Sequence, residues 1–343
     1  MLILGFAAAA LVAFVVAATV AWLVARNASR LRLVDVPNER SSHQSLTPRG
    51  GGVGIVAGVA AGILVLTFTV IPLARDLAAL LGGAAAMALL GAIDDRRSIP
   101  ARYRLVVQAA VAVVVVILLG GVGRLPLPPP LDLPLGLLAA PLAVLWLVTV
   151  TNFYNFMDGI DGLAGGQAVA SCAGVVIAVW SVGAVELAIV LAAAALGFLL
   201  LNSPPARIFL GDVGSTSLGF AIAGLPLLAP EPGRPMAVFA VAVGLSLFLL
   251  DPLETLFRLV RARRPIGVAH RAHSYQALAS SRERHRVVTA GLVLAGLVLS
   301  LGGGLAYNRE WLAWPVFVLA LATFAAERFL AGRARGAARL GPQ

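Results

Sequence analysis

The chain has 343 residues, of which 60% are hydrophobic and 12% are charged. A soluble domain averages about 25% charged residues, so this composition excludes a soluble globular protein and indicates one that has lipid as its solvent. The single cysteine, Cys172, excludes a disulfide framework. The net charge of +10 comes from arginines that lie between apolar runs, which favours a membrane surface over a nucleic acid as the basic chain's partner.

Apolar runs of about the 20 residues that a membrane span needs recur along the whole chain. The first run has no basic segment before it, so it predicts a span rather than a signal peptide. The eleven predicted spans are 2–24, 51–72, 77–93, 105–122, 134–151, 167–183, 185–202, 214–230, 236–257, 287–306 and 311–330. The sequence therefore predicts an all-α polytopic membrane protein with about eleven transmembrane helices. It forms one integral-membrane domain over residues 1–343, with a flexible basic tail at 331–343.

The connections between these spans alternate in charge. One set contains only Arg75, Arg124, Arg234 and Arg309, whereas the other 22 arginines lie in the opposite set or at its span ends. Arginine-rich connections stay on the cytoplasmic side of a membrane. The pattern predicts a periplasmic N-terminus and a cytoplasmic C-terminus, as the odd number of spans also requires.

The first polar cluster follows the first span and runs from Asp35 to Gly52. Prolines and glycines keep it irregular, so its backbone N–H groups, with Arg40, His43 and Arg49, fit a cradle for an anion. The competing interpretation is an ordinary basic loop beside anionic lipid, and the segment taken alone favours that interpretation.

The second cluster is the carboxylate pair Asp94 and Asp95, which closes the third span. Adjacent carboxylates repel each other unless a cation lies nearby, and Mg²⁺ is suited to one or two carboxylates plus phosphate oxygens. The alternative is a solvated turn that Arg96 and Arg97 neutralise. Both interpretations stay open from these residues alone. Arg104 follows at the start of the fourth span.

The third cluster begins at Asn152 and is the most specific of the five. Asn155, Asp158 and Asp161 recur every third residue, so a helical turn would place them on neighbouring positions of one face. The glycines among them allow a close approach of the backbone to a ligand. A polar connection is the alternative, but three oxygen-bearing side chains beside an apolar span favour a site.

The fourth cluster runs from Asn202 to Ser215 and contains Asp212, which directly precedes a span. An aspartate at that place fits the N-cap of a helix. It is also well placed to bind a metal ion through its carboxylate. The sequence leaves both interpretations open.

The fifth cluster lies in the longest inner connection, residues 258–286. Arg264 and Arg271 suit bidentate phosphate binding. His270 and His273 can exchange a proton near neutral pH or bind a metal. The chain offers no thiolates that would complete a thiol-rich zinc site.

Together the five clusters supply oxygen ligands for a divalent cation and arginines for phosphate, all on one side of the membrane. Phosphoryl transfer depends on this combination, because positioning and charge neutralisation do most of its work. In order and spacing the motifs resemble those of the polyprenyl-phosphate N-acetylhexosamine-1-phosphate transferases, which include the enzyme that makes lipid I and the initiators of O-antigen synthesis. The resemblance extends from Asp35 to about Gln276.

The resemblance implies a role for each matching residue. The expected catalytic residues are Asp94, Asp95, Asp158, Asp161, His270 and His273. The expected substrate-binding residues are Arg49, Arg104, Asn152, Asn155, Arg264 and Arg271. The expected metal ligands are Asp212 and Asn155. The family often has a lysine where this chain has Arg104. Its segment His-Arg-Ala-His-Ser-Tyr-Gln looks like the branch that uses UDP-N-acetylfucosamine or UDP-N-acetylquinovosamine.

The implied reaction transfers a sugar 1-phosphate from a UDP-N-acetylhexosamine to undecaprenyl phosphate and releases UMP, the first step of a cell-surface polysaccharide. The resemblance implies Mg²⁺ as cofactor, with Mn²⁺ as the alternative metal. It also implies a bacterial inner-membrane location with a cytoplasmic site, and a homodimer, which is common in the family. No nucleic-acid partner is expected.

The alternative function is a transporter or flippase for an anionic lipid or solute. Such a protein would carry charges near the middle of the bilayer and broken helices in both halves. Asp251 and Glu254 are the candidates for charges of that kind.

Overall fold

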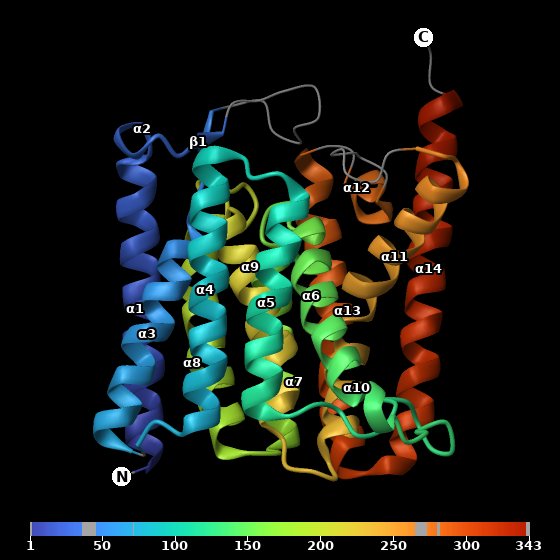
Figure 1. The fold of residues 1–343 in the computed structure, drawn as a ribbon. Helices are drawn as coiled ribbons and strands as arrows, with labels where there is room; N and C mark the ends of the chain where they lie inside the picture. The colour runs from blue at the N-terminus through green and yellow to red at the C-terminus, as the bar shows by residue number, and fades with distance from the viewer. Residues whose placement is uncertain (1, 36–45, 71, 265–272, 280–281, 341–343) are drawn as a thin grey trace.

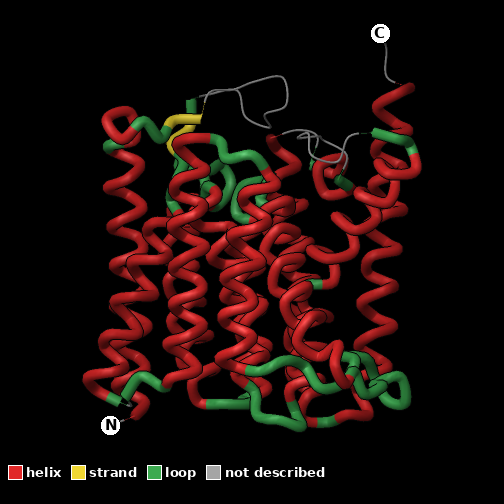
Figure 2. Tube along the Cα trace, viewed as in Figure 1, coloured by secondary structure: helices red, strands yellow, loops and turns green. Residues whose placement is uncertain are grey.

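The structure is a computed structural model that describes residues 2–35, 46–70, 72–264, 273–279 and 282–340. It is a bundle of helices that run mostly side by side (Figure 1), with loops gathered at its two ends (Figure 2). In chain order the elements are α1 (Leu2–Arg26), α2 (Ala28–Leu31), β1 (Val34–Asp35), β2 (Thr47–Pro48), α3 (Gly52–Thr69), α4 (Arg75–Arg97), α5 (Ala101–Leu119), η1 (Gly136–Leu138), α6 (Ala139–Met157), α7 (Leu163–Ala178), α8 (Val182–Asn202), α9 (Asp212–Gly224), η2 (Leu225–Leu228), α10 (Arg234–Gly244), α11 (Ser246–Arg261), α12 (Ser274–Leu278), α13 (Arg282–Asn308), η3 (Glu310–Leu312) and α14 (Ala313–Leu340).

Every predicted span falls on helical structure, which confirms an all-α polytopic membrane fold. Within the described residues, eight helices are long and apolar enough to cross a membrane, and the bent pair α10 and α11 makes up to nine. The other two predicted spans correspond to the shorter apolar helices α7 and α9. Eight or nine of the eleven predicted spans thus have full span length in the described residues, and the count of eleven stays a prediction.

The short helix α9 lies inside the bundle rather than at its lipid-facing surface. Its residues Val213–Gly224 are all buried, and it packs against α4 and α6. A helix that is apolar and buried on every side belongs to the protein interior. Because α9 begins at Asp212, that residue lies at one end of a helix buried inside the bundle.

Small residues let the first two long helices approach closely. The buried face of α1 repeats Ala9, Ala13 and Ala17 at intervals of four residues. A Cβ atom added to Gly58 of α3 would lie 2.5 Å from the carbonyl oxygen of Ala13. Packing of small residues replaces the hydrophobic effect as the force between helices in lipid. Large apolar side chains such as Phe68 instead lie exposed on the outside of the bundle, where lipid would cover them.

A bend of 72° separates α10 from α11 at Leu245. A break in a helix frees backbone groups that must find other partners inside a membrane protein. The side chain of Gln167, on α7, donates a hydrogen bond to the carbonyl oxygen of Gly244 at 3.0 Å. This buried amide compensates one of the groups that the bend releases.

The start of α1 and the end of α14 lie at opposite ends of the bundle: α1 begins at the lower end in Figure 1, and α14 ends at the upper end. The proline-rich connection 123–133 lies at the lower end and is not helical, as predicted, with Arg124 paired to Asp132 at 2.9 Å. α14 continues as helix to Leu340, and the flexibility expected of the tail at 331–343 stays a prediction. Alanine and arginine are strong helix formers and no proline interrupts them.

Candidate active site

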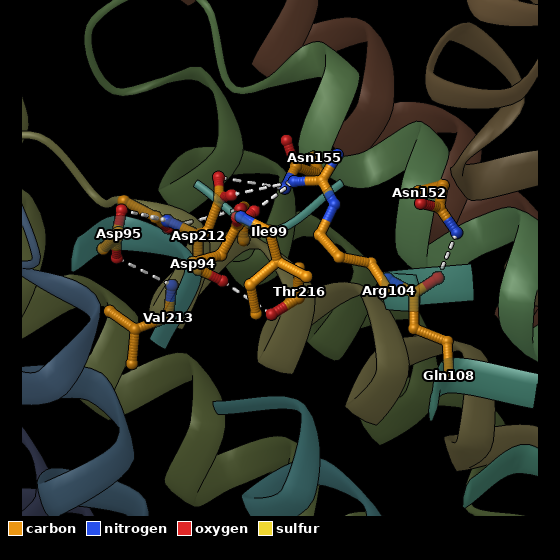
Figure 3. Close-up of polar contacts among 12 residues, drawn as sticks. Asp94, Asp95, Ile99, Arg104, Gln108, Asn152, Asn155, Asp212, Val213 and Thr216 are labelled. Atoms are coloured by element: carbon orange, nitrogen blue, oxygen red, sulfur yellow. Dashed lines mark hydrogen bonds and ion pairs between the residues drawn. The ribbon is translucent and has the colours of Figure 1, made fainter. Parts of the chain in front are cut away.

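Four helices bring polar residues together at the upper end of the bundle (Figure 3). α4 contributes Asp94 and Asp95, α5 contributes Arg104, α6 contributes Asn155 and α9 contributes Asp212. These residues come from three polar clusters that lie far apart in the sequence. The fold joins them through a continuous set of hydrogen bonds and ion pairs.

Asp95 caps the N-terminus of α9 from a different helix. Its two carboxylate oxygens accept the backbone N–H groups of Asp212 and Val213, each at 3.2 Å. The first N–H groups of a helix have no partner within the helix, and a carboxylate both satisfies them and complements the helix dipole. The N-cap alternative for Asp212 is therefore wrong: Gly211 holds the N-cap position and makes no side-chain cap. The Asp212 carboxylate is left to other partners.

The guanidinium of Arg104 lies between two carboxylates. Its Nη1 atom pairs with Oδ2 of Asp94 and, at 3.2 Å, with Oδ2 of Asp212. The side-chain amide of Asn155 donates to the other oxygen of Asp212 at 3.1 Å. The Asp212 carboxylate is thus held by one cationic and one neutral donor, from α5 and α6.

The solvated-turn interpretation of Asp94 and Asp95 is wrong. Their side chains are buried, at 7% and 6% exposure, whereas Arg96 and Arg97 are exposed. The balancing charge for Asp94 comes from Arg104, on the next helix. A buried carboxylate needs such pairing, because isolation from water penalises its charged form.

Two glycines allow α4 and the start of α9 to approach this closely. A Cβ atom added to Gly91 would lie 2.3 Å from the carbonyl oxygen of Asp212. Gly211 has a φ of +75°, and a Cβ there would lie 2.9 Å from the carboxylate of Asp95. A side chain at either position would push apart the backbone and the carboxylates that meet here.

Arg49 reaches the same region from the first cluster. Its Nη2 atom donates to the backbone carbonyl of Asp95. The N–H groups of Gly51 and Gly52 bond to the carbonyl oxygens of Phe209 and Leu210, each at 2.9 Å. These two amides are therefore not free to cradle an anion, which corrects that part of the expectation. Arg40 and His43 lie outside the described residues.

The predicted single helical face of Asn155, Asp158 and Asp161 is wrong, because α6 ends at Met157. Asp158 follows the helix end, and a turn leads to Gly162, whose φ of +77° suits glycine. Asp161 is buried and accepts the backbone N–H of Ala206 at 2.9 Å, which ties this turn to the segment before α9. Of the three residues, Asn155 contacts the acidic cluster directly, through Asp212.

Asp158 lies in the electrostatic field of the other carboxylates. Burial, followed by the charges of Asp212, Asp95 and Asp161, raises the pKa of Asp158 to about 8. A carboxyl with this pKa is mostly protonated at neutral pH, so it limits the negative charge of the cluster. A bound cation would lower the pKa again by offsetting that charge.

The last inner loop is described only in part. His270 and Arg271 lie outside the described residues, and Arg264 is exposed. His273 is buried at the start of α12, where its Nδ1 atom lies 3.6 Å from Oδ1 of Asp251 on α11. His273 therefore packs beside Asp251, on α11.

Asn152 lies one turn before Asn155 and contacts a neighbouring helix. Its Nδ2 atom donates to the side chain of Gln108 at 2.6 Å and to the carbonyl oxygen of Val148 at 2.7 Å (Figure 3). The first bond connects α6 to α5, and the second lies within α6. The side-chain amide of Asn152, which was expected to bind substrate, thus donates its hydrogen bonds within the protein.

The described residues contain no ready group of three His, Cys, Asp or Glu side chains that would hold a metal ion. The donors present are nevertheless the oxygen type that Mg²⁺ prefers, and Mg²⁺ requires only one or two protein carboxylates beside phosphate and water. The guanidinium between Asp94 and Asp212 indicates that a positive charge is stabilised there. The residues therefore fit a magnesium ion shared with a phosphate ligand.

Sequence reasoning missed three buried polar residues of this region: Gln108, Asp251 as a partner of the last loop, and Tyr275. Gln108 follows Arg104 by one helical turn, and a polar side chain inside an apolar span was a usable signal. Asp251 carries the same signal. Tyr275 carried none, because an aromatic residue in a loop has many ordinary roles.

Comparison with known proteins adds to this geometry. A model of glycosyl transferase family 4 matches residues 77–229, which include most of α4 and all of α5, α6 and α9. A probable undecaprenyl-phosphate N-acetylglucosaminyl 1-phosphate transferase of Bacillus subtilis (strain 168) is 32% identical over 286 residues, covering 81% of this chain and 78% of that protein.

Two further relatives are named undecaprenyl-phosphate alpha-N-acetylglucosaminyl 1-phosphate transferase. The one from Escherichia coli (strain K12) is 29% identical over 85% of this chain and 83% of its own length. The one from Yersinia pestis is 30% identical over 87% of this chain and 84% of its own length. The chain therefore belongs to glycosyl transferase family 4, within the polyprenyl-phosphate N-acetylhexosamine-1-phosphate transferases, and is a membrane enzyme of the phosphotransferase class.

Proposed function

We infer that the protein transfers a sugar 1-phosphate from a UDP-N-acetylhexosamine to undecaprenyl phosphate and releases UMP. The observation that carries this inference is the convergence of Asp94, Asp95 and Asp212 with Arg104 and Asn155 at one end of the bundle. Carboxylates that bind a divalent cation and an arginine that binds phosphate are the groups that phosphoryl transfer requires. The names of the relatives support undecaprenyl phosphate as the acceptor.

The reaction exchanges one phosphorus–oxygen bond for another. An oxygen of the lipid phosphate attacks the phosphorus that carries the sugar, and the bond from that phosphorus to the UMP oxygen breaks. UMP leaves with the bonding electron pair, and the product is a polyprenyl diphosphosugar. Where the lipid phosphate carries a proton, a carboxylate of the cluster accepts it.

Asp94 is better suited than Asp95 to act on the reactants. Both oxygens of Asp95 already accept backbone N–H groups of α9, so its carboxylate holds the site together. Asp94 accepts the N–H of Ile99 with one oxygen and pairs with the side chain of Arg104 through the other. Movement of the guanidinium onto a substrate phosphate would free one oxygen of Asp94.

Asp212 would hold Mg²⁺ with help from Asn155, and the bound ion would offset negative charge on the diphosphate during transfer. Arg104 binds a phosphate oxygen in the same step, since its guanidinium already lies beside Asp94 and Asp212. Arg49 keeps the end of α4 in place through the Asp95 carbonyl. Mn²⁺ is the alternative metal, because it accepts the same oxygen ligands.

The active site faces the cytoplasm of a bacterial inner membrane in this proposal. The arginine-rich connections and the acidic cluster lie at the same end of the bundle, and basic connections stay on the cytoplasmic side. The relatives named above favour UDP-N-acetylglucosamine as donor. The segment around residues 270–276 instead favours UDP-N-acetylfucosamine or UDP-N-acetylquinovosamine, and a cell-surface polysaccharide such as O-antigen as the pathway.

The test is UMP release by the purified protein with Mg²⁺, undecaprenyl phosphate and each UDP-sugar in turn. We expect release with at least one UDP-N-acetylhexosamine and none when undecaprenyl phosphate is omitted. The Asp132→Asn variant, altered in an ion pair at the opposite end of the bundle, is the matched control and should retain full activity. An absence of release with every sugar would contradict the proposal.

The transporter alternative has less support. It predicts broken helices in both halves of the chain, whereas the described residues contain one bent pair, α10 and α11. Asp94, Asp95 and Asp212, which are joined by hydrogen bonds and ion pairs, lie near the upper end of the bundle and not at its middle. No specific observation favours transport over transfer.

A further inference from the structure

A second buried carboxylate organises the polar end of the bundle outside the cluster in Figure 3. Asp251, on α11, has an exposed fraction of 0%. Its oxygens accept the backbone N–H of Ser274 at 2.9 and 3.0 Å and the backbone N–H of Tyr275 at 3.2 Å. These amides belong to the first turn of α12, and His273 lies directly before it. Asp251 therefore binds the N-terminus of α12 as Asp95 binds that of α9.

Tyr275 carries this contact onward to the turn that follows α6. Its side chain is completely buried, and its hydroxyl donates to the carbonyl oxygen of Phe156 at 2.9 Å. A Cβ atom added to Gly159 would lie only 2.1 Å from the same hydroxyl. Tyr275 thus packs directly on the backbone that carries Asn155 and Asp158.

α12 has five residues and depends on these contacts for its position. An isolated helix of this length is not stable, because the nucleus costs more conformational entropy than its few hydrogen bonds return. A hydrogen bond from Arg328 to the Ser274 hydroxyl, at 3.0 Å, also ties α12 to α14. The backbone of α12, however, is bound by Asp251.

One ion pair joins α11 to α14, and a second lies within α11 beside it. Glu254 pairs with Arg258 and with Arg328, each at 2.8 Å. These pairs do not involve the Asp251 carboxylate. Loss of that carboxylate would therefore free the first turn of α12 from α11, while α11 and α14 remain connected.

We propose that Asp251 is a positioning residue: through the backbone of α12 and the Tyr275 hydroxyl it fixes the end of α6 and the turn after it, which present Asn155 and Asp158 to the substrates. The proposal deepens the function proposed above and rests on it for its kinetic consequence. Neither Asp251 nor Tyr275 has to touch a substrate for this role. A shift of the turn by a fraction of an ångström would misplace groups that must align in the transition state.

The kinetic test compares Asp251→Asn and Tyr275→Phe with the matched controls Asp132→Asn and Tyr307→Phe. Tyr307 lies near the opposite end of the bundle, where it packs on Trp180. We expect kcat to fall roughly tenfold in both test variants, with KM for the UDP-sugar within about twofold of the parent. The double variant should be no slower than the slower single variant, because the two residues act in series. Unchanged kcat, or additive losses, would overturn the proposal.

The steric test uses Gly159→Ala. In the parent chain the new methyl group meets the Tyr275 hydroxyl, so we expect a clear loss of melting temperature and faster hydrogen exchange over residues 156–162. Combination with Tyr275→Phe removes the hydroxyl and should restore most of the melting temperature. Gly82→Ala, where a Cβ meets no atom within 4 Å, is the control. The same loss with phenylalanine as with tyrosine at position 275 would contradict the contact.

Hydrogen exchange separates this proposal from the proposed function. Asp251→Asn should speed exchange over residues 156–162 and 273–279 while leaving α9 protected, whichever substrate the enzyme uses. Absence of UMP release by the parent protein would refute the proposed function without changing this exchange result. Unchanged exchange over 156–162 in Asp251→Asn would refute the positioning role even in a fully active enzyme.

Discussion

The carboxylate of Asp95 accepts the backbone N–H of Asp212 at 3.2 Å, although the two residues are 117 positions apart in the chain. One acidic residue thus forms the cap of the helix whose first side chain is another acidic residue. The cap stabilises the start of α9 and fixes the direction of the Asp212 carboxylate. Asp95 and Asp94 are neighbours in sequence, yet their contacts predict different consequences when each is changed.

Asp95→Asn should lower stability and activity together, whereas Asp94→Asn should lower activity with little change in stability. The asparagine at 95 keeps one acceptor for the two N–H groups of α9 and loses the charge, which costs about 1–2 kcal/mol for a helix cap. Asp94 pairs with Arg104, which still has Asp212 as a partner in the variant. Thermal unfolding in detergent and UMP release measure the two effects. Equal melting temperatures for the two variants would contradict the capping role.

Gly91→Ala should disrupt the acidic cluster, whereas Gly82→Ala, on the same helix, should leave it intact. The methyl group at position 91 would lie 2.3 Å from the carbonyl oxygen of Asp212, whereas at position 82 it meets nothing within 4 Å. We expect Gly91→Ala to lose at least about 1–3 kcal/mol of stability through overpacking and most of its activity. Gly82→Ala should gain about 0.5–1 kcal/mol from helix propensity. Thermal unfolding and UMP release of the pair check both results.

The stability of the metal-free protein should fall as pH rises from about 4 to about 8. The pKa of Asp158 rises from 3.8 to about 8 on folding, so the folded state binds the proton more tightly over this interval. The resulting stabilisation is complete below pH 3.8 and is lost as pH rises through the folded-state pKa.

Asp158→Asn removes the titrating proton and should flatten this part of the pH profile. Melting temperatures in EDTA at several pH values measure the difference between the variant and the parent. A parent profile that matches the Asn variant between pH 5 and 8 would show that Asp158 does not hold its proton in the folded state.

Mg²⁺ should raise the melting temperature of the parent protein and not that of Asp212→Asn. A ligand present at 100 times its dissociation constant stabilises a folded protein by about 2.7 kcal/mol. Asp132→Asn retains the site and should respond like the parent, which controls for general effects of the salt. Equal stabilisation of Asp212→Asn would remove Asp212 from the metal site.

Asn152→Ala should mainly lower the stability of the protein, whereas Asn155→Ala should mainly lower its catalytic rate. Asn152 bonds to Gln108 on the neighbouring helix, so its loss leaves a buried amide unpaired and should cost about 1–3 kcal/mol of stability. Asn155 bonds to the Asp212 carboxylate, so its loss should lower kcat more than stability. A large rise in KM for Asn152→Ala with unchanged stability would restore the substrate-binding role that the sequence predicted.

The sequence by itself determined the fold class and the elements of the site. Continuous apolar runs of span length satisfy their backbone in lipid as helices, and each predicted run lies mainly on helix in the described residues. Costly polar residues such as Asp94, Asp95 and Asp212 stood out against that apolar background, because each must be compensated in or near hydrocarbon. Their motifs also pointed to the family before any geometry was known.

Only the tertiary structure decided which partner each polar residue has. No local pattern links Asp95 to the N–H groups of α9 or Arg104 to Asp212, because these contacts join residues from different helices. Helix ends likewise depended on context: the three-residue spacing from Asn155 to Asp161 fits a helix, but the chain turns after Met157. Hydrogen bonds and close packing act over a few ångströms, so their partners are fixed by the fold and not by distance along the chain.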